Sequence, residues 1–182
     1  MALWIVLGII LIIIFVIISL YNNMVHLRLK VKNAWAQIDT QLKRRFDLIP
    51  NLVETVKGYM NHEEKTLTQI TEARNKFTSA SDISDMSDAN NSLTNGLKSV
   101  FALAEAYPDL KANTNFMSLQ KELSDTENKI AYSRQFYNDT VQMYNTAIMT
   151  FPSNLFAKMF GFKEEKFFEI IDSEKENVKV EF

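Results

Sequence analysis

The first twenty residues limit what this chain can fold into more than any other segment. The stretch ALWIVLGIILIIIFVIISL, residues 2–20, has no charged side chain, and its only polar side chain is Ser19. About 20 apolar residues in a helix span the ~30 Å hydrocarbon core of a bilayer. A signal peptide would begin with basic residues and end at a small-residue cleavage site, and the segment has neither feature. The sequence therefore predicts a retained transmembrane anchor over residues 1–22.

The cations nearest the predicted anchor all follow it. Arg28, Lys30 and Lys32 come soon after Leu20, and no basic side chain precedes the apolar segment. Positively charged flanks stay on the cytoplasmic side of a membrane. We therefore expect a single-pass protein with its N-terminus outside the cell and the bulk of the chain in the cytoplasm.

After the anchor, apolar residues recur every three or four positions, which is the spacing of amphipathic helices and coiled coils. The pattern has no strand-like alternation. It predicts an all-α fold in which the transmembrane helix continues into an antiparallel up-and-down four-helix bundle over residues 23–151. The predicted bundle helices are at about 23–45, 48–78, 88–106 and 113–151.

A run of cations followed by Asp and Pro, in LKRRFDLIPN, interrupts the first long pattern. Pro50 is tolerated in the first turn of a helix, and Asp47 is a suitable N-cap for that helix. The sequence thus favours a corner between two antiparallel helices. A single kinked helix is the alternative, because the apolar register continues through the proline.

Two further turns are expected. Asp85 or Ser87 can cap the third bundle helix, Pro108 ends it, and Asn113 can cap the fourth. In an up-and-down bundle, the YPDLKAN turn shares the membrane-distal end with the LKRRFDLIPN corner. We expect the cations of that corner to neutralise the helix end, or to form with nearby side chains a docking surface for an acidic protein partner. The surface would comprise Lys43, Arg44, Arg45, Asp47, Tyr107, Asp109 and Leu110.

Aromatic residues and lysines alternate in the segment 152–170, which the topology returns to the membrane. Such a segment can lie among lipid headgroups, and the alternative is that its rings cap the end of the bundle. The residues 171–182 read as an acidic flexible tail. The residues expected at the membrane interface are Phe156, Phe160, Phe162, Phe167 and Phe168.

The composition argues against catalysis. The chain has no Cys, two His and four scattered Gly, so thiolate chemistry, histidine-based chemistry and phosphate-binding loops have little material. His62 with Glu63 and Glu64 lacks the second His of a zinc motif, and Glu122, Asp125 and Glu127 lack a Glu-x-x-His partner. The net charge of −2 disfavours nucleic acid. We expect no enzyme activity, no cofactor and no metal.

Three stretches resemble signature segments of the LemA family: QIDTQLKRRFDLIPNLVETVKGYMNHE, AEAYPDLKANTNFMSLQKELSDTENKI and FPSNLFAKMFGF. The resemblance covers nearly the whole chain, with the stretches in family order. It implies a bacterial cell-membrane protein with a cytoplasmic four-helix bundle and no established enzymatic activity. It also suggests a membrane metalloprotease as a candidate partner, and some relatives are linked to magnetosome membranes.

Two functions follow from these patterns. The first is a non-enzymatic, membrane-anchored scaffold or adaptor that presents its bundle to a protein partner. The second is a self-assembling, membrane-organising protein that places its anchor and Phe-rich segment on lipid. A long three-four stripe can face a second copy of the chain, so a homo-oligomer is compatible with either function.

Overall fold

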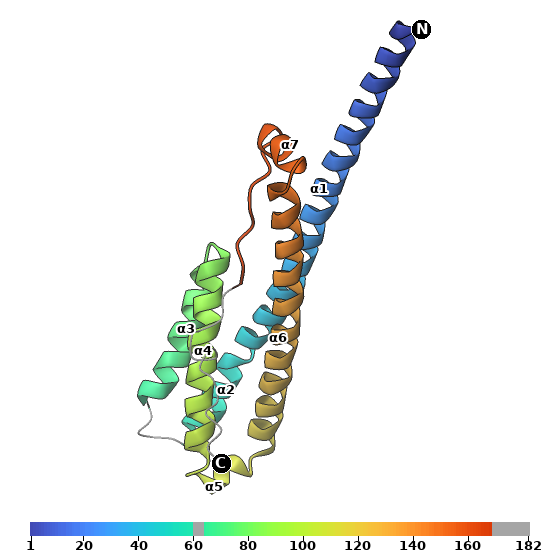
Figure 1. Ribbon diagram of the computed structural model, residues 1–182. Coiled ribbons are helices and arrows are strands. Elements are labelled where there is room, and N and C mark those ends of the chain that lie inside the picture. The colour runs from blue at the N-terminus through green and yellow to red at the C-terminus, as the bar shows by residue number, and fades with distance from the viewer. Residues whose placement is uncertain (60–63, 169–182) are drawn as a thin grey trace, which may run out of the picture. The chain divides into compact units, whose positions relative to one another are not determined.

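The computed structural model describes residues 1–59 and 64–168 (Figure 1). Every regular element in these ranges is a helix, which confirms the all-α fold class. His62, Glu63 and the tail predicted over 171–182 lie outside the described residues. The helices are α1 (Ala2–Asp47), α2 (Ile49–Lys57), α3 (Glu64–Ser79), α4 (Ile83–Ala104), α5 (Pro108–Lys111), α6 (Thr114–Met149) and α7 (Ser153–Met159).

The chain divides into two compact units. Unit 1 combines Met1–Gln37 with Ser133–Phe167, and unit 2 is built on Ile38–Tyr132. The long helices α1 and α6 each contribute residues to both units.

The N-terminal part of α1 is long and apolar enough to cross a membrane. Its most apolar window has a mean hydropathy of 3.3, and none of that window is buried. Large side chains from Leu3 to Ile18 are exposed almost without exception. This is the helix that the first twenty residues predict.

Unit 1 packs the following part of α1 against the second half of α6. Trp35 of α1 makes an edge-to-face contact with Tyr137 of α6, with ring centroids 5.6 Å apart. The buried side chains recur at three- and four-residue intervals, so each helix turns one apolar stripe toward the other. They are Met24, Val31 and Ala34 of α1, and Tyr137, Val141, Tyr144 and Ile148 of α6.

Unit 2 is an up-and-down bundle of the end of α1 with α2, then α3, α4 and the first half of α6 (Figure 1). Phe46 at the end of α1 stacks on Phe77 near the end of α3, with centroids 4.1 Å apart. Phe101 of α4 meets Phe116 of α6 edge to face. The core side chains of α1, α2, α3 and α4 include Leu42, Leu52, Val56, Ile70, Leu93, Leu97 and Val100, all nearly inaccessible.

The predicted corner at LKRRFDLIPN is wrong, and the alternative of a kinked helix is what forms. Only Leu48 separates α1 from α2, and its backbone stays helical, with φ −76° and ψ −20°. Pro50 lies in the first turn of α2, where its missing N–H is tolerated. Asp47 makes no cap, because the N-cap position falls on Leu48 without a side-chain bond. The chain therefore passes the proline without reversing.

The helix predicted over 48–78 is two helices, because α2 ends at Lys57 and α3 begins at Glu64. The two run antiparallel (Figure 1). The next helix begins at Ile83 rather than near 88, because Asp82 caps it and accepts a bond from the Asp85 backbone N–H at 3.0 Å. Asn113 caps α6 as predicted, accepting from the backbone N–H of Asn115 and Phe116.

The helices α3 and α4 approach each other closely at Gly96. A Cβ on this residue would lie 2.5 Å from Ile70 Cγ2. A β-branched side chain in a helix has one strongly favoured rotamer, so Ile70 cannot turn away without strain. The absence of a side chain at Gly96 therefore sets the spacing of the α3–α4 pair.

Replacing Gly96→Ala is expected to lower the free energy of unfolding by about 1–2 kcal/mol, despite the gain of ~1 kcal/mol in helix propensity. Thermal unfolding followed by circular dichroism measures the change. Gly58→Ala is the matched control, because its nearest neighbour, the Thr55 carbonyl oxygen, is 3.8 Å away. A Gly96→Ala protein as stable as the Gly58→Ala protein would contradict the close approach.

Candidate functional site

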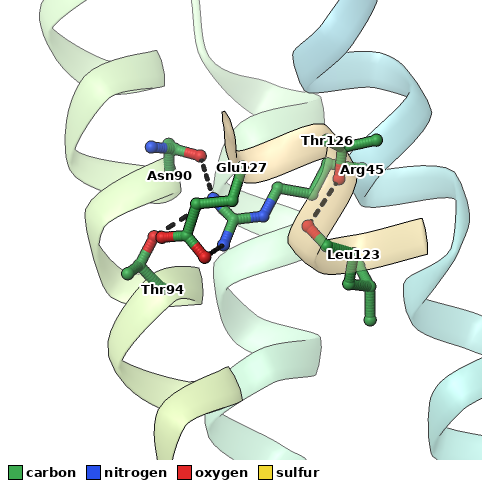
Figure 2. A network of polar contacts seen from close by, with 6 residues as sticks. All are labelled: Arg45, Asn90, Thr94, Leu123, Thr126 and Glu127. Atoms are coloured by element: carbon green, nitrogen blue, oxygen red, sulfur yellow. Dashed lines mark hydrogen bonds and ion pairs between the residues drawn. The ribbon is translucent and has the colours of Figure 1, made fainter. Parts of the chain in front are cut away.

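Arg45, in the last turn of α1, lies inside unit 2 with 1% of its side chain exposed. Its Nη1 donates hydrogen bonds to Asn90 Oδ1 at 2.8 Å and to Thr94 Oγ1 at 3.1 Å, both on α4 (Figure 2). Its Nη2 is 3.3 Å from Glu127 Oε2 on α6. One guanidinium therefore connects three helices.

The charged guanidinium of Arg45 lies in the protein interior, where the loss of solvent disfavours the charged form. Burial lowers the pKa of Arg45, and the carboxylate of Glu127 acts in the opposite direction. Nε and Nη2 have no hydrogen-bond acceptor within the described part of the chain. A buried cation of this kind is costly without its counter-charge. The network is therefore a structural one.

The three predicted corner cations do not form one surface. Lys43 is 64% exposed and pairs with Asp39 at 2.6 Å, while Arg44 is 53% exposed and lies 3.7 Å from Glu122. Neighbouring helix residues point about 100° apart, and Arg45 falls on the same buried face as Leu42. The prediction that Arg45 contacts a partner is therefore incompatible with its burial.

The other predicted docking residues are also separated by burial. Asp47 and Asp109 are exposed and Tyr107 is half-buried, whereas Leu110 is completely buried and cannot be an apolar anchor for a partner. The YPDLKAN turn is bound to a residue that follows α2, because Asn113 Nδ2 donates to Tyr59 Oη at 3.0 Å.

A groove between α2 and α3, which sequence reasoning missed, has a volume of about 430 Å³. Its apolar part is made by buried Ile49, exposed Pro50 and half-buried Val53. The spacing of Pro50 and Val53 resembles that of core residues, so nothing in the sequence marks them as groove-lining. The charged residues that line the groove are Glu54, Lys57 and Arg74, and Thr71 completes it.

The Phe-rich segment of unit 1 is fastened to α6 by polar side chains. Tyr144 Oη donates to the Lys163 carbonyl at 2.9 Å, and Tyr137 Oη donates to the Lys166 carbonyl at 2.8 Å. Between them, the Asn145 amide makes two 2.9 Å bonds with the backbone of Glu165. The segment therefore runs along α6 in a defined register.

The five phenylalanines predicted at the membrane interface differ in exposure. Phe160 and Phe167 are 44% and 47% exposed, Phe156 and Phe162 are half-buried, and Phe168 is buried. The prediction is wrong for Phe168, because its ring packs inside the protein. The other large exposed side chains near α7 are Met149, Phe151, Leu155 and Met159.

Comparison with known proteins assigns the family. The model of the LemA family matches residues 34–182. The chain belongs to the LemA family. The matched residues include the Arg45 network, the α2–α3 groove and the Phe-rich segment that is hydrogen-bonded to α6.

A curated LemA protein agrees with this assignment, and two magnetosome proteins are similar over shorter stretches. Protein LemA of Metamycoplasma hominis is 27% identical over 169 residues, which cover 90% of this chain and 75% of that protein. Magnetosome protein MamQ of Magnetospirillum gryphiswaldense is 30% identical over 80 residues, covering 44% of this chain and 29% of MamQ. Magnetosome protein MamQ 2 of Paramagnetospirillum magneticum is 30% identical over 81 residues, covering 44% of this chain and 30% of that protein.

Two adjacent arginines of this LemA chain should respond very differently to truncation. Arg45→Ala is expected to lower the free energy of unfolding by about 3 kcal/mol or more, because it empties a core position and leaves Asn90 without its donor. Arg44→Ala is expected to cost less than about 1 kcal/mol, because its ion pair is exposed. Thermal or chemical denaturation measures both values. Equal effects would contradict the burial of Arg45.

Alkaline pH should loosen unit 1 through Tyr137. Burial raises the pKa of Tyr137 to about 12, and the nearby Glu165 carboxylate adds to the rise. Because the folded pKa exceeds the ordinary value near 10, this stabilisation is complete below pH ~10 and is lost as the pH rises toward about 12. Between pH 9 and pH 11, the melting temperature should fall less for Tyr137→Phe than for the wild type. An equal fall in both proteins would contradict the raised pKa of Tyr137.

Proposed function

We propose that this LemA family chain is a non-catalytic, membrane-anchored scaffold that binds an acidic segment of a protein partner in the α2–α3 groove. The observation that carries the proposal is the groove itself. It combines an apolar surface with charged residues, the arrangement in which a few buried anchors supply most of the binding energy. The family assignment is compatible with this role and names no reaction.

The charges favour an acidic occupant. Among the described residues that line the groove, Lys57 and Arg74 are cationic and Glu54 is anionic, so the net charge of this described lining is positive. An arginine can bind a carboxylate through two parallel hydrogen bonds, which fixes the register of a bound segment. Apolar side chains of the same segment would contact Pro50 and Val53. We therefore expect a partner helix or extended strand in which apolar residues alternate with Asp or Glu.

The anchor favours a partner in the same membrane. The cations Arg28, Lys30 and Lys32 are exposed on α1 beyond the apolar segment, and they support a cytoplasmic location for the remaining chain. A partner embedded in the same bilayer meets the groove at high effective concentration. A membrane metalloprotease, which the family resemblance suggests, is one candidate of this class.

The proposal is tested by crosslinking mass spectrometry on the full-length protein in its native membrane. Crosslinks from Lys57 should reach peptides of a partner that are rich in Asp and Glu. Val53→Glu should reduce their yield by about tenfold or more, because it places a carboxylate in the apolar part of the groove. Asn51→Glu is the matched control, since it adds the same charge at an exposed position of α2.

The variants must first be shown to melt like the wild type. Unchanged crosslinks in a folded Val53→Glu protein would contradict the proposal, as would self-links alone. Self-links alone would instead favour the membrane-organising alternative. Charge reversal by Arg74→Glu gives an independent check, because it should remove acidic peptides without altering the apolar contacts.

A further inference from the structure

A group of large apolar side chains is exposed around the junction of α6 and α7 in unit 1. We name it the α7 cap: Met149, Phe151, Leu155, Met159 and Phe160, which are 60%, 81%, 60%, 65% and 44% exposed. Phe151, Leu155 and Met159 follow one another at intervals of four residues. Leu155 and Met159 lie four residues apart on α7 and share one face of that helix, while Phe151 lies in the turn that precedes it. An exposed apolar patch of this kind marks a site that contacts a membrane, a protein partner or a ligand.

Ring contacts attach one end of the cap to α1. Tyr21 makes edge-to-face contacts with Phe160 and Phe162, with centroid distances of 5.0 and 5.8 Å. Tyr21 directly follows Leu20, the last residue of the apolar segment that can cross a membrane. Tyrosine is enriched where a transmembrane helix leaves the hydrocarbon core. The cap therefore lies next to α1 at the level where the apolar segment ends.

The inward side of α7 and the segment after it hold the cap in place. Ala157 is buried, and its carbonyl accepts a hydrogen bond from the Phe162 N–H at 2.9 Å. The next residues are bound to α6 through Tyr144, Asn145 and Tyr137, as described above. These contacts hold the inward face of α7 against the protein, so the side chains of its opposite face stay exposed.

Cations accompany the apolar face. Lys158 lies between Leu155 and Met159 in sequence and is exposed, and Lys163 is exposed just beyond Phe162. Arg28 of α1 is close enough to act electrostatically on Tyr144. An apolar face with lysines beside it is typical of helices that lie in the headgroup layer of anionic membranes.

We propose that the α7 cap inserts into the headgroup layer of the bilayer that α1 crosses, as a second membrane contact of the same chain. The occupant of this surface is lipid, because the surface continues the apolar face of α1 through Tyr21. The proposal rests on the membrane anchoring of α1 and is independent of any partner in the α2–α3 groove. It also replaces the predicted set of five phenylalanines with Phe160, Phe151 and three aliphatic or thioether side chains.

The absence of cysteine makes a direct test possible in the full chain. Leu155→Cys and Met159→Cys are labelled singly with a nitroxide, and the protein is reconstituted into vesicles of phosphatidylcholine and phosphatidylglycerol. We expect collisions of these labels with lipid-soluble oxygen to exceed those with a water-soluble nickel chelate by several-fold. A label at Phe136→Cys is the control, because Phe136 is 53% exposed on α6, about 20 Å along the helix from Met149.

A further label, at Phe15→Cys in the apolar segment, reports whether α1 is inserted. If Phe15→Cys is in lipid while the Leu155 and Met159 labels match the Phe136 control, the cap proposal is overturned and the anchor stands. Labels that are shielded from both reagents and broadened by spin–spin coupling, which dilution with unlabelled protein removes, would show a second copy on the cap and would also overturn it.

Discussion

The guanidinium of Arg45 is the interaction on which the packing of unit 2 depends. It reaches Asn90 and Thr94 on α4 and lies 3.3 Å from Glu127 on α6, so three helices share one charge. Apolar stripes alone tolerate slippage of one helix along another, because leucine and isoleucine faces fit in more than one register. A buried cation has acceptors at one register only, and any other leaves the charge unpaired at high cost. The groove lies between α2 and α3 of the same unit.

In unit 1, neutral hydroxyl and amide side chains hold the C-terminal segment against α6. This segment has no helix to satisfy its backbone carbonyls, and hydroxyl and amide side chains of α6 bond to them instead. Each such bond contributes only about 1 kcal/mol, but three in succession define a register. This fastening leaves the apolar side chains of α7 exposed next to Tyr21. Two surfaces of different chemistry result, a cationic groove in unit 2 and an apolar cap in unit 1.

The sequence predicted the helical class and the long helix α6 from their regular three-four spacing, and the apolar N-terminal part of α1 from an unbroken run of apolar residues. It misplaced the first reversal of the bundle, since Pro50 and Asp47 are equally compatible with a kink and with a corner. Only tertiary packing decides between them. It also read Arg45 as part of a surface charge cluster, although the acceptors that make its burial tolerable come from residues 45 and 82 positions away. The exposure of Leu155 and Met159 depends likewise on which face of α7 is turned inward, and that is the face of buried Ala157.

Site-specific photocrosslinking in native membranes tests the division between the two surfaces most directly. A benzophenone amino acid replaces Val53 in one full-length protein and Leu155 in another, and the adducts are identified by mass. This division predicts a protein adduct at position 53 and a lipid adduct at position 155. Lipid at position 53, or the same protein adduct at both positions, would contradict it.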